Sequence, residues 1–382
     1  MSFYEVIQKF DKDMLRFISQ KADIADVKRA LAKESILPEE LAVLLSPAAA
    51  GCLEEMARKA KDNTLRHFGN AIILYAPLYL SNYCVNNCLY CGFNVHNRME
   101  RRKLTIEEVA REAESISQSG IRHILLLTGE SRKHSSVEYI KDCIKEAAKY
   151  FTSISIEVYP LEVDEYRMLV ENGCDGLTIY QEVYDEDMYG VMHPGGPKRD
   201  YRYRLDTPER GCKGGMRSLG VGALLGLGDW RAEAFYTAMH AYYLNKNYPE
   251  VEISVSLPRI RPHCGSFSVP HPVNDREFVQ IMLAFRIFLP HVGITISTRE
   301  RAELRDNLIG LGVTRMSAGS VTEVGGYSSK RGDGQFEVSD DRSVEEIRQM
   351  LYNKGYQPVF KDWQYLQNGG ISSGWSGKDA GC

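Results

Sequence analysis

Residues 71–91 of the chain read AIILYAPLYLSNYCVNNCLYC. The first ten of these residues are almost continuously apolar, which is typical of a strand buried on both faces of a parallel sheet. The run is followed at once by Cys84, Cys88 and Cys91, so three thiols lie within eight residues on the next loop. The stretch therefore predicts a buried parallel strand whose following loop carries chemistry.

Similar short apolar runs recur along the chain and alternate with amphipathic segments. The predicted strands are 71–80, 123–129, 153–159, 176–181, 218–227, 251–257, 293–298 and 313–318. Between them, Thr105 with Glu108 and Ser135 with Glu138 form capping-box patterns, which indicate helix starts. Eight such units favour a parallel (β/α)8 TIM-type barrel, whose functional residues gather at the carboxyl ends of the strands. An open doubly wound sheet is disfavoured, because no G-x-G-x-x-G follows the first strand.

The predicted barrel occupies residues 71–320 and has an extension at each end. Apolar residues at helical spacing predict an N-terminal helical extension over 1–70. Residues 321–368 predict a short C-terminal extension, and the Gly/Ser-rich 369–382 a flexible tail. The polar connection 184–216 is expected to be a loop that covers the functional end of the barrel.

The composition is that of an ordinary globular protein. Of 382 residues, 43% are hydrophobic and 26% charged, and the net charge of −4 gives no reason to expect nucleic-acid binding. No apolar run approaches the ~18 residues of a membrane span, and the N-terminus lacks a secretory pattern. A cytoplasmic, reducing compartment is expected, in which nine cysteines are thiols or metal ligands.

The cysteine-rich loop is the strongest chemical signal. Three thiolates can hold three irons of a [4Fe–4S] cluster and leave the fourth iron open to another molecule. Two alternatives stay open: a structural zinc site completed by His96, and a thioredoxin-like pair made only by Cys88 and Cys91. The other internal cysteines lack paired spacing, and most are expected to be small buried hydrophobes: Cys52, Cys143, Cys174, Cys212 and Cys264.

The C-x3-C-x2-C spacing, with the aromatic Tyr90 before the last cysteine, resembles the radical S-adenosylmethionine (SAM) superfamily. The resemblance implies two cofactors, a [4Fe–4S] cluster and SAM, with SAM chelating the open iron. It also implies that the reduced cluster cleaves SAM to methionine and a 5′-deoxyadenosyl radical. The cofactors would then carry the difficult chemistry while the protein binds and orients.

Other predicted strand ends fit the same resemblance. Gly129-Glu130 is similar to the family's Gly-Gly-Glu segment, which binds the amino group of SAM, although Thr128 replaces the first glycine. A glutamate that starts a helix is the alternative interpretation. The resemblance assigns Glu157, at the end of the third strand, to the ribose. Gly222 lies in a Gly-rich stretch like the one beside the adenine, or else eases strand–helix packing.

Several stretches resemble the branch of this superfamily that cleaves aromatic amino acids, and the match runs from about residue 35 to about residue 367. They are Tyr79–Tyr83, Cys91–Phe93, Tyr180–Tyr184, His193–Lys198 and Ser297–Glu300. The resemblance assigns Arg299 and Ser317 to substrate binding. Residue chemistry agrees, because a guanidinium fork can grip a carboxylate and a hydroxyl can accept from an amine.

Alternatives for the arginines stay open at this stage. Arg299 is also placed to form an ion pair with an acidic residue of the next helix, namely Glu300, Glu303 or Asp306. Arg259 and Arg261 end another predicted strand and are further candidates to meet SAM or substrate.

The resemblance favours the 2-iminoacetate synthase family of tyrosine lyases. Hydrogenase-maturation lyases carry three further C-terminal cysteines, whereas only Cys382 follows Cys264 here. The implied reaction cleaves the Cα–Cβ bond of L-tyrosine to 2-iminoacetate and p-cresol for thiamine synthesis. Implied partners are thiazole synthase and an electron donor such as flavodoxin or ferredoxin. The alternatives are a hydrogenase-maturation or tryptophan lyase, and a non-catalytic zinc-stabilised barrel.

Overall fold

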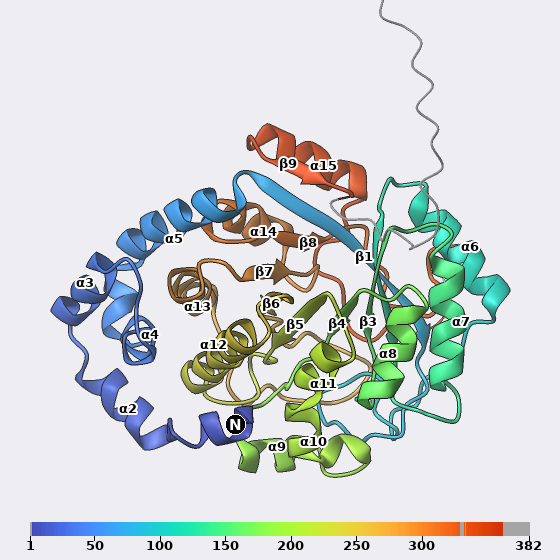
Figure 1. Cartoon of the computed structure of the whole chain (residues 1–382), viewed down its shortest axis with the longest axis horizontal. Coiled ribbons are helices and arrows are strands. Elements are labelled where there is room, and N and C mark those ends of the chain that lie inside the picture. Colours follow the sequence, from blue (N-terminus) through green and yellow to red (C-terminus); the bar gives the residue numbers. More distant parts are fainter. Residues whose placement is uncertain (1, 329–331, 333, 362–382) are drawn as a thin grey trace, which may run out of the picture.

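Eight parallel strands close into a barrel in the computed structural model, which describes residues 2–328, 332 and 334–361 (Figure 1). The strands are β1 Ala71–Ser81, β2 His123–Thr128, β3 Ser153–Glu157, β4 Gly176–Thr178, β5 Ser218–Gly222, β6 Glu252–Ser256, β7 Gly293–Ile296 and β8 Arg315–Ser317. β1 lies between β8 and β2 and pairs with both, which closes the sheet. The (β/α)8 prediction is confirmed, and each predicted strand is present.

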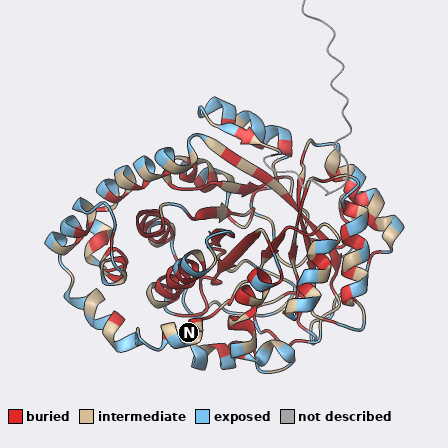
Figure 2. Cartoon of the chain, in the orientation of Figure 1, coloured by how far each residue is buried: buried red, intermediate tan, exposed pale blue. Residues whose placement is uncertain are grey.

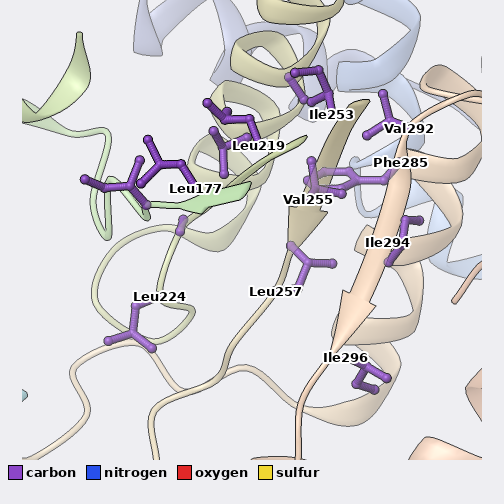
Figure 3. Close-up of a cluster of buried hydrophobic side chains, with 14 of the residues drawn as sticks. Leu177, Leu219, Leu224, Ile253, Val255, Leu257, Phe285, Val292, Ile294 and Ile296 are labelled. Atoms are coloured by element: carbon purple, nitrogen blue, oxygen red, sulfur yellow. The ribbon is translucent and has the colours of Figure 1, made fainter. Parts of the chain in front are cut away.

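The strands direct apolar side chains outward, and several strands direct small polar side chains inward. Ile253 and Val255 of β6 and Ile294 of β7 lie in a buried cluster with Phe285 of the helix α13, Asp275–Phe288 (Figure 3). Residues on the alternate positions line a small cavity inside the barrel, and they include Ser153, Ser155, Ser254 and Ser256. The expectation of strands apolar on both faces is therefore wrong for β3 and β6. Their side chains alternate with the period of two that a pleated strand imposes.

Helices cover the outside of the barrel, and Figure 2 shows their buried residues on the sides that face the strands. They are α6 Ile106–Ser117, α7 Val137–Ala147, α8 Val163–Glu171, α11 Thr207–Lys213, α12 Trp230–Asn247, α13 Asp275–Phe288, and α14 Ala302–Leu308, which the short 3-10 helix Ile309–Leu311 follows. The capping box of Thr105 and Glu108 is confirmed at the start of α6. The one at Ser135 is wrong by one residue, because Ser136 caps α7 and Ser135 is buried beneath the hydroxyl of Tyr159.

Both chain extensions lie against the barrel. The first 70 residues form α1 Phe3–Ile7, α2 Lys12–Lys21, α3 Ile24–Ala32, α4 Pro38–Leu44, the 3-10 helix Ala48–Gly51 and α5 Leu53–Phe68, an arc along one side (Figure 1). After β8, the chain forms α15 Val344–Asn353 and β9 Gln357–Val359. β9 pairs in parallel with the first residues of β1, a ninth strand that the sequence pattern did not indicate. The tail expected at 369–382 lies outside the described residues.

The connection 184–216 is not a loop. It forms α9 Glu186–Met192, a 3-10 helix over Pro197–Arg199 and α10 Tyr201–Leu205 before α11 begins. Its aromatic residues explain the difference, because Tyr189 and Tyr201 are buried with their rings 5.1 Å apart. The segment is therefore a packed part of the wall at the carboxyl ends of the strands.

No helix in the described part of the chain combines the length and the apolar character needed to cross a membrane.

Candidate active site

A cavity of about 940 Å³ opens at the carboxyl ends of the strands. Its wall includes Cys84, Cys88 and Cys91 from the loop after β1, together with residues that follow β2, β3, β4, β6 and β7. Residues 335 and 336, from the C-terminal part of the chain, complete it. Side chains that are far apart in the sequence thus face one space, as the barrel topology predicts.

The loop that carries the cysteines has no helix or strand of its own, so other contacts hold it. The amides of Asn87 and Leu89 donate to the carbonyls of Gly195 (3.0 Å) and Met192 (3.1 Å). The Arg101 guanidinium donates to backbone carbonyls on both sides of the three cysteines. Buried backbone groups that lack secondary structure need such partners, and here they position the loop against the segment after α9.

The three thiols line one cavity, as the ligands of a single cluster must. Cys88 is 5% exposed, and burial raises its pKa to about 12 and also raises the pKa of Cys91. A metal centre bound here must therefore displace the thiol protons. Among the described residues, no three His, Cys, Asp or Glu side chains are placed to ligate one metal ion. A cluster does not need such convergence, because each cysteine binds a different iron.

The zinc alternative is not supported by the geometry. The His96 side chain is exposed and is absent from the cavity wall, so it does not join the three cysteines. The thiol set fits a [4Fe–4S] cluster better than a single zinc ion.

Gly129 and Glu130 lie beside the cysteine loop on the cavity wall. A Cβ at Gly129 would lie 2.5 Å from the Tyr83 carbonyl oxygen, so only glycine lets β2 end this close to the loop. The Glu130 carboxylate accepts from the Asn86 amide nitrogen at 2.6 Å. Since α7 begins only at Val137, Glu130 does not start a helix.

Tyr90 also lines the cavity, and its hydroxyl lies 2.7 Å from Nε2 of His193. Nδ1 of His193 lies 2.8 Å from the Tyr189 carbonyl, which can only accept, so the proton is on Nδ1 and Nε2 accepts from Tyr90. Burial lowers the pKa of His193 to about 3, which keeps the ring neutral. This pairing connects the cysteine loop to the end of α9.

A second cavity of about 530 Å³ lies deeper in the barrel and shares several wall residues with the first. Glu157, Tyr180 and Arg299 face both spaces. Burial, together with the nearby Glu182 charge, raises the pKa of Glu157 to about 7, and Arg299 opposes this shift. Because Glu157 lies inside the barrel, a ligand can reach its carboxyl group only through these two cavities.

Arg299 is a cation at the junction of the two cavities. Its guanidinium lies 3.4 Å from the centre of the Phe336 ring, and it has no ion pair among the described residues. The three acidic residues of the alternative interpretation have other partners: Glu300 binds Arg259 and Arg261, Glu303 binds Arg301 and Asp306 binds Arg342. The structure therefore leaves the Arg299 guanidinium available to a ligand.

Ser317 faces the inner cavity, and its hydroxyl oxygen accepts from the Thr298 amide at 3.0 Å. Gly222 lines neither cavity: a Cβ there would lie 2.4 Å from the Ser256 carbonyl oxygen. That contact agrees with the packing interpretation. Of the two further arginines, Arg261 faces the outer cavity, whereas Arg259 points to Glu300 and Asp275.

A buried charge group on the same wall was missed from the sequence. Glu182 lies 2.7 Å from the Lys198 ammonium and 3.6 Å from the Arg204 guanidinium. Burial alone would raise its pKa, but the two cations outweigh this and lower it. Glu182 has a positive φ of +71°, and no other non-glycine residue among those described has a positive φ. Such strain concentrates at functional sites.

Cys264 is an exposed residue, contrary to its expected burial, and its thiol donates to the Gly92 carbonyl. The other four internal cysteines outside the loop are buried as expected.

A barrel with three cysteines on the loop after its first strand, facing a cavity at the carboxyl ends, defines an iron–sulfur barrel enzyme. Comparisons with known proteins agree. The Radical SAM superfamily model matches residues 78–239, and the Biotin and Thiamin Synthesis associated domain matches 256–357. Superfamily members use a [4Fe–4S] cluster and SAM, and these are the cofactors that the site residues would hold.

The 2-iminoacetate synthase of Escherichia coli is 38% identical over 364 residues, which cover 95% of this chain and 97% of that relative. The one of Salmonella typhimurium is 37% identical with the same coverage. The crystal structure of HydG, a maturase of the FeFe-hydrogenase, has a TM-score of 0.86 at 34% identity, covering 92% of this chain and 80% of that one. The chain belongs to the 2-iminoacetate synthase family of radical SAM lyases.

Proposed function

We propose that the chain cleaves the Cα–Cβ bond of L-tyrosine and releases 2-iminoacetate (dehydroglycine) and p-cresol. SAM would be converted to methionine and 5′-deoxyadenosine in the same turnover. The hydrogen that 5′-deoxyadenosine gains would come from the tyrosine amino group, and the released hydroxybenzyl fragment would take up one electron and one proton. Relatives with 97% coverage that are named for 2-iminoacetate support this assignment.

The observation that carries the proposal is the unpaired Arg299 guanidinium at the junction of the two cavities. A guanidinium binds a carboxylate through two parallel hydrogen bonds, so a substrate carboxylate bound there would be held in one orientation. The amine and Cα of that substrate would then lie at the mouth of the cavity that the cysteines line. Ser317, on the inner wall, is proposed to accept from the amine.

The inner cavity suits an aromatic side chain. Tyr79, Tyr180 and Phe336 contribute rings to its wall, and Leu125 and Leu127 contribute aliphatic surface. Ring–ring contacts add about 0.5–1.5 kcal/mol to the burial of apolar area. Holding both ends of the amino acid in one pose is the proximity contribution to catalysis.

When bound, the cluster and SAM supply the one-electron chemistry that generates a 5′-deoxyadenosyl radical. We propose that Cys84, Cys88 and Cys91 hold the cluster, and that Tyr90, Gly129, Glu130 and Glu157 contact SAM. Gly222 can contribute only through packing, since it does not reach the cavity wall. The Glu182–Lys198–Arg204 group and the Phe336 ring close the wall and would exclude water from the reacting atoms.

The test is an anaerobic assay with reconstituted, reduced protein. Tyrosine and SAM should yield p-cresol and glyoxylate, the hydrolysis product of 2-iminoacetate, in step with 5′-deoxyadenosine. A 3-methylindole product from tryptophan would reassign the chain to a tryptophan lyase, and cyanide would indicate a maturation-type lyase. A colourless protein without the broad absorbance of a [4Fe–4S] cluster would instead favour a zinc-stabilised barrel.

The product and the redox chemistry suggest the surroundings of the reaction. Because an imine hydrolyses in water, we propose direct transfer to a thiazole synthase. The electron would come from a low-potential donor such as flavodoxin or ferredoxin, and a reduced cluster fits a cytoplasmic location.

A further inference from the structure

A segment from the C-terminal part of the chain reaches the cysteine loop. A Cβ at Gly92 would lie 2.3 Å from the Gln335 carbonyl oxygen, so the two backbones meet there without room for a side chain. The Glu337 amide donates to the Pro262 carbonyl at 2.9 Å, which ties the segment to the connection that follows β6. The backbone of Gln335 is therefore held against the residue that follows Cys91.

The Gln335 amide bridges two walls of the site. Its Nε2 donates to the sulfur of Cys91 at 3.7 Å, and its Oε1 accepts from the Tyr79 hydroxyl at 2.8 Å. A metal-bound thiolate can only accept, so the amide must turn its N–H side toward Cys91. Tyr79 lines the inner cavity, and its hydroxyl holds the amide in that orientation by donating to the oxygen.

We infer that Gln335 is a positioning residue for the Cys91 ligand, and that its N–H···S hydrogen bond makes the cluster easier to reduce. Reduction adds negative charge to the cluster and its thiolates, and a donor to sulfur stabilises that charge. In the described part of the chain, no other side chain donates a hydrogen bond to any of the three loop sulfurs. Its removal therefore takes away a contact that no second side chain replaces.

The inference rests on the proposed cluster assignment but not on tyrosine as the substrate. A redox titration of the reconstituted holoenzyme, followed by electron paramagnetic resonance without SAM or tyrosine, reads it directly. Gln335→Glu keeps the oxygen that accepts from Tyr79, removes the donor and adds a negative charge. Gln335→Leu removes both contacts at nearly constant volume. Glu337→Gln, an exposed position two residues further along, is the matched control.

At the midpoint potential of the unmodified protein, the ratio of reduced to oxidised cluster should fall about tenfold in Gln335→Leu, a shift of about 59 mV for one electron. Gln335→Glu should fall at least as far, because it also brings a carboxylate next to the thiolate. Glu337→Gln should leave the ratio unchanged. A variant that keeps the melting temperature of the apo-protein but binds less iron would support the same contact through loss of the Cys91 ligand.

An unchanged potential in both Gln335 variants, with normal iron content, would overturn the inference and leave the residue a structural role. Loss of folding in Gln335→Leu alone would leave Gln335→Met, an uncharged variant of similar length that lacks the donor, to decide by the same shift. Failure of the proposed function is separate: it would appear as an unmodified protein that forms no cluster, or one whose cluster is normal but which does not cleave tyrosine.

Discussion

The two ends of the barrel differ in how their charged side chains are paired. At the amino ends of the strands, Asp175 binds Arg217, Arg217 binds Glu252, and Glu252 binds Arg315. Asp175 also accepts from the Ile154 amide at 2.8 Å, so every member of this chain of charges has a partner. The network connects β3, β4, β5, β6 and β8 where they begin.

At the carboxyl ends, two charged residues that line the cavities, Arg299 and Glu157, form no ion pair within the described part of the chain. Arg299 has no ion pair among the described residues, and Glu157 has a raised pKa of about 7. Glu182 is paired but strained. A protein that maximised stability would pair such groups, so their state marks the end that is kept for a ligand. One end holds the barrel together and the other performs its chemistry.

Cys88→Ala, at the carboxyl end, should have the largest effect and tests whether this end of the barrel performs the chemistry. It should abolish 5′-deoxyadenosine formation and the visible absorbance of the cluster, because one of three ligands is lost. The apo-protein should lose little stability, since the side chain is small. Cys143→Ala, another buried thiol outside the site, is the control and should keep full activity. Retained SAM cleavage in Cys88→Ala would refute the ligand assignment.

Arg299→Lys tests whether the unpaired cation binds the substrate carboxylate. A lysine keeps the charge but not the bidentate fork, so KM for tyrosine should rise about 10- to 100-fold, or about 1.5–3 kcal/mol. SAM cleavage should continue and become uncoupled from p-cresol. Arg301→Lys, two residues away and paired with Asp275, should behave like the unmodified chain. An unchanged KM in Arg299→Lys would remove the functional half of the comparison.

Asp175→Ala tests the other end. It leaves the buried Ile154 amide and the Ser153 hydroxyl without their acceptor, so the free energy of unfolding should fall by about 2–4 kcal/mol. Because the site lies at the opposite end, kcat at saturating tyrosine should stay within twofold at a temperature where the variant is folded. Chemical denaturation of the apo-protein measures the free energy of unfolding. For Asp175→Asn, this free energy should lie between those of the unmodified protein and Asp175→Ala. A large loss of kcat would show that the ends are not separate.

The raised pKa of Glu157 predicts a pH dependence of stability. An acid whose pKa is raised on folding binds its proton more tightly in the folded state, so the stability it confers is present at low pH and lost as pH rises through about 7. Its charged neighbours are Glu182, Arg299, Lys198 and Arg204. Between pH 5 and 8, the apo-protein should therefore lose up to about 2 kcal/mol more than Glu157→Gln, after allowance for cavity water. If the melting temperatures of the unmodified protein and of Glu157→Gln changed in parallel with pH, this prediction would be contradicted.

Much of the fold could be predicted because its signals are local. Apolar runs of strand length located all eight barrel strands, and the cysteine spacing located the loop after β1. Glu157 is the last residue of its strand and Arg299 follows the end of its own, and the barrel topology brings such residues into one space. The capping box at Thr105 depends on four consecutive residues and was correctly predicted, whereas the adjacent serines before α7 left a choice that only burial decides.

What could not be predicted depends on contacts between distant residues. Tyr79 and Gln335 are 256 residues apart, and no local pattern marks a glutamine as the partner of a cysteine ligand. The helices of 184–216 could not be predicted, because the segment is rich in polar residues whose partners lie outside it. Lys198, for example, donates to Glu182. β9 has only three residues and a proline, too short a run for a strand signal.

The smallest expected effect is that of Thr105→Ala, which tests how far the ligand-binding region extends at the carboxyl end of the barrel. Thr105 caps α6 at the carboxyl end of the barrel, and Glu108 completes the box while it pairs with Arg102 at 2.7 Å. Neither residue lines the cavities, so Thr105→Ala should cost about 1 kcal/mol of unfolding free energy and leave kcat and KM unchanged. Ser136→Ala, at the cap of α7, should behave alike. If either variant altered KM for tyrosine, the ligand-binding region would extend beyond the cavity wall into the starts of these helices.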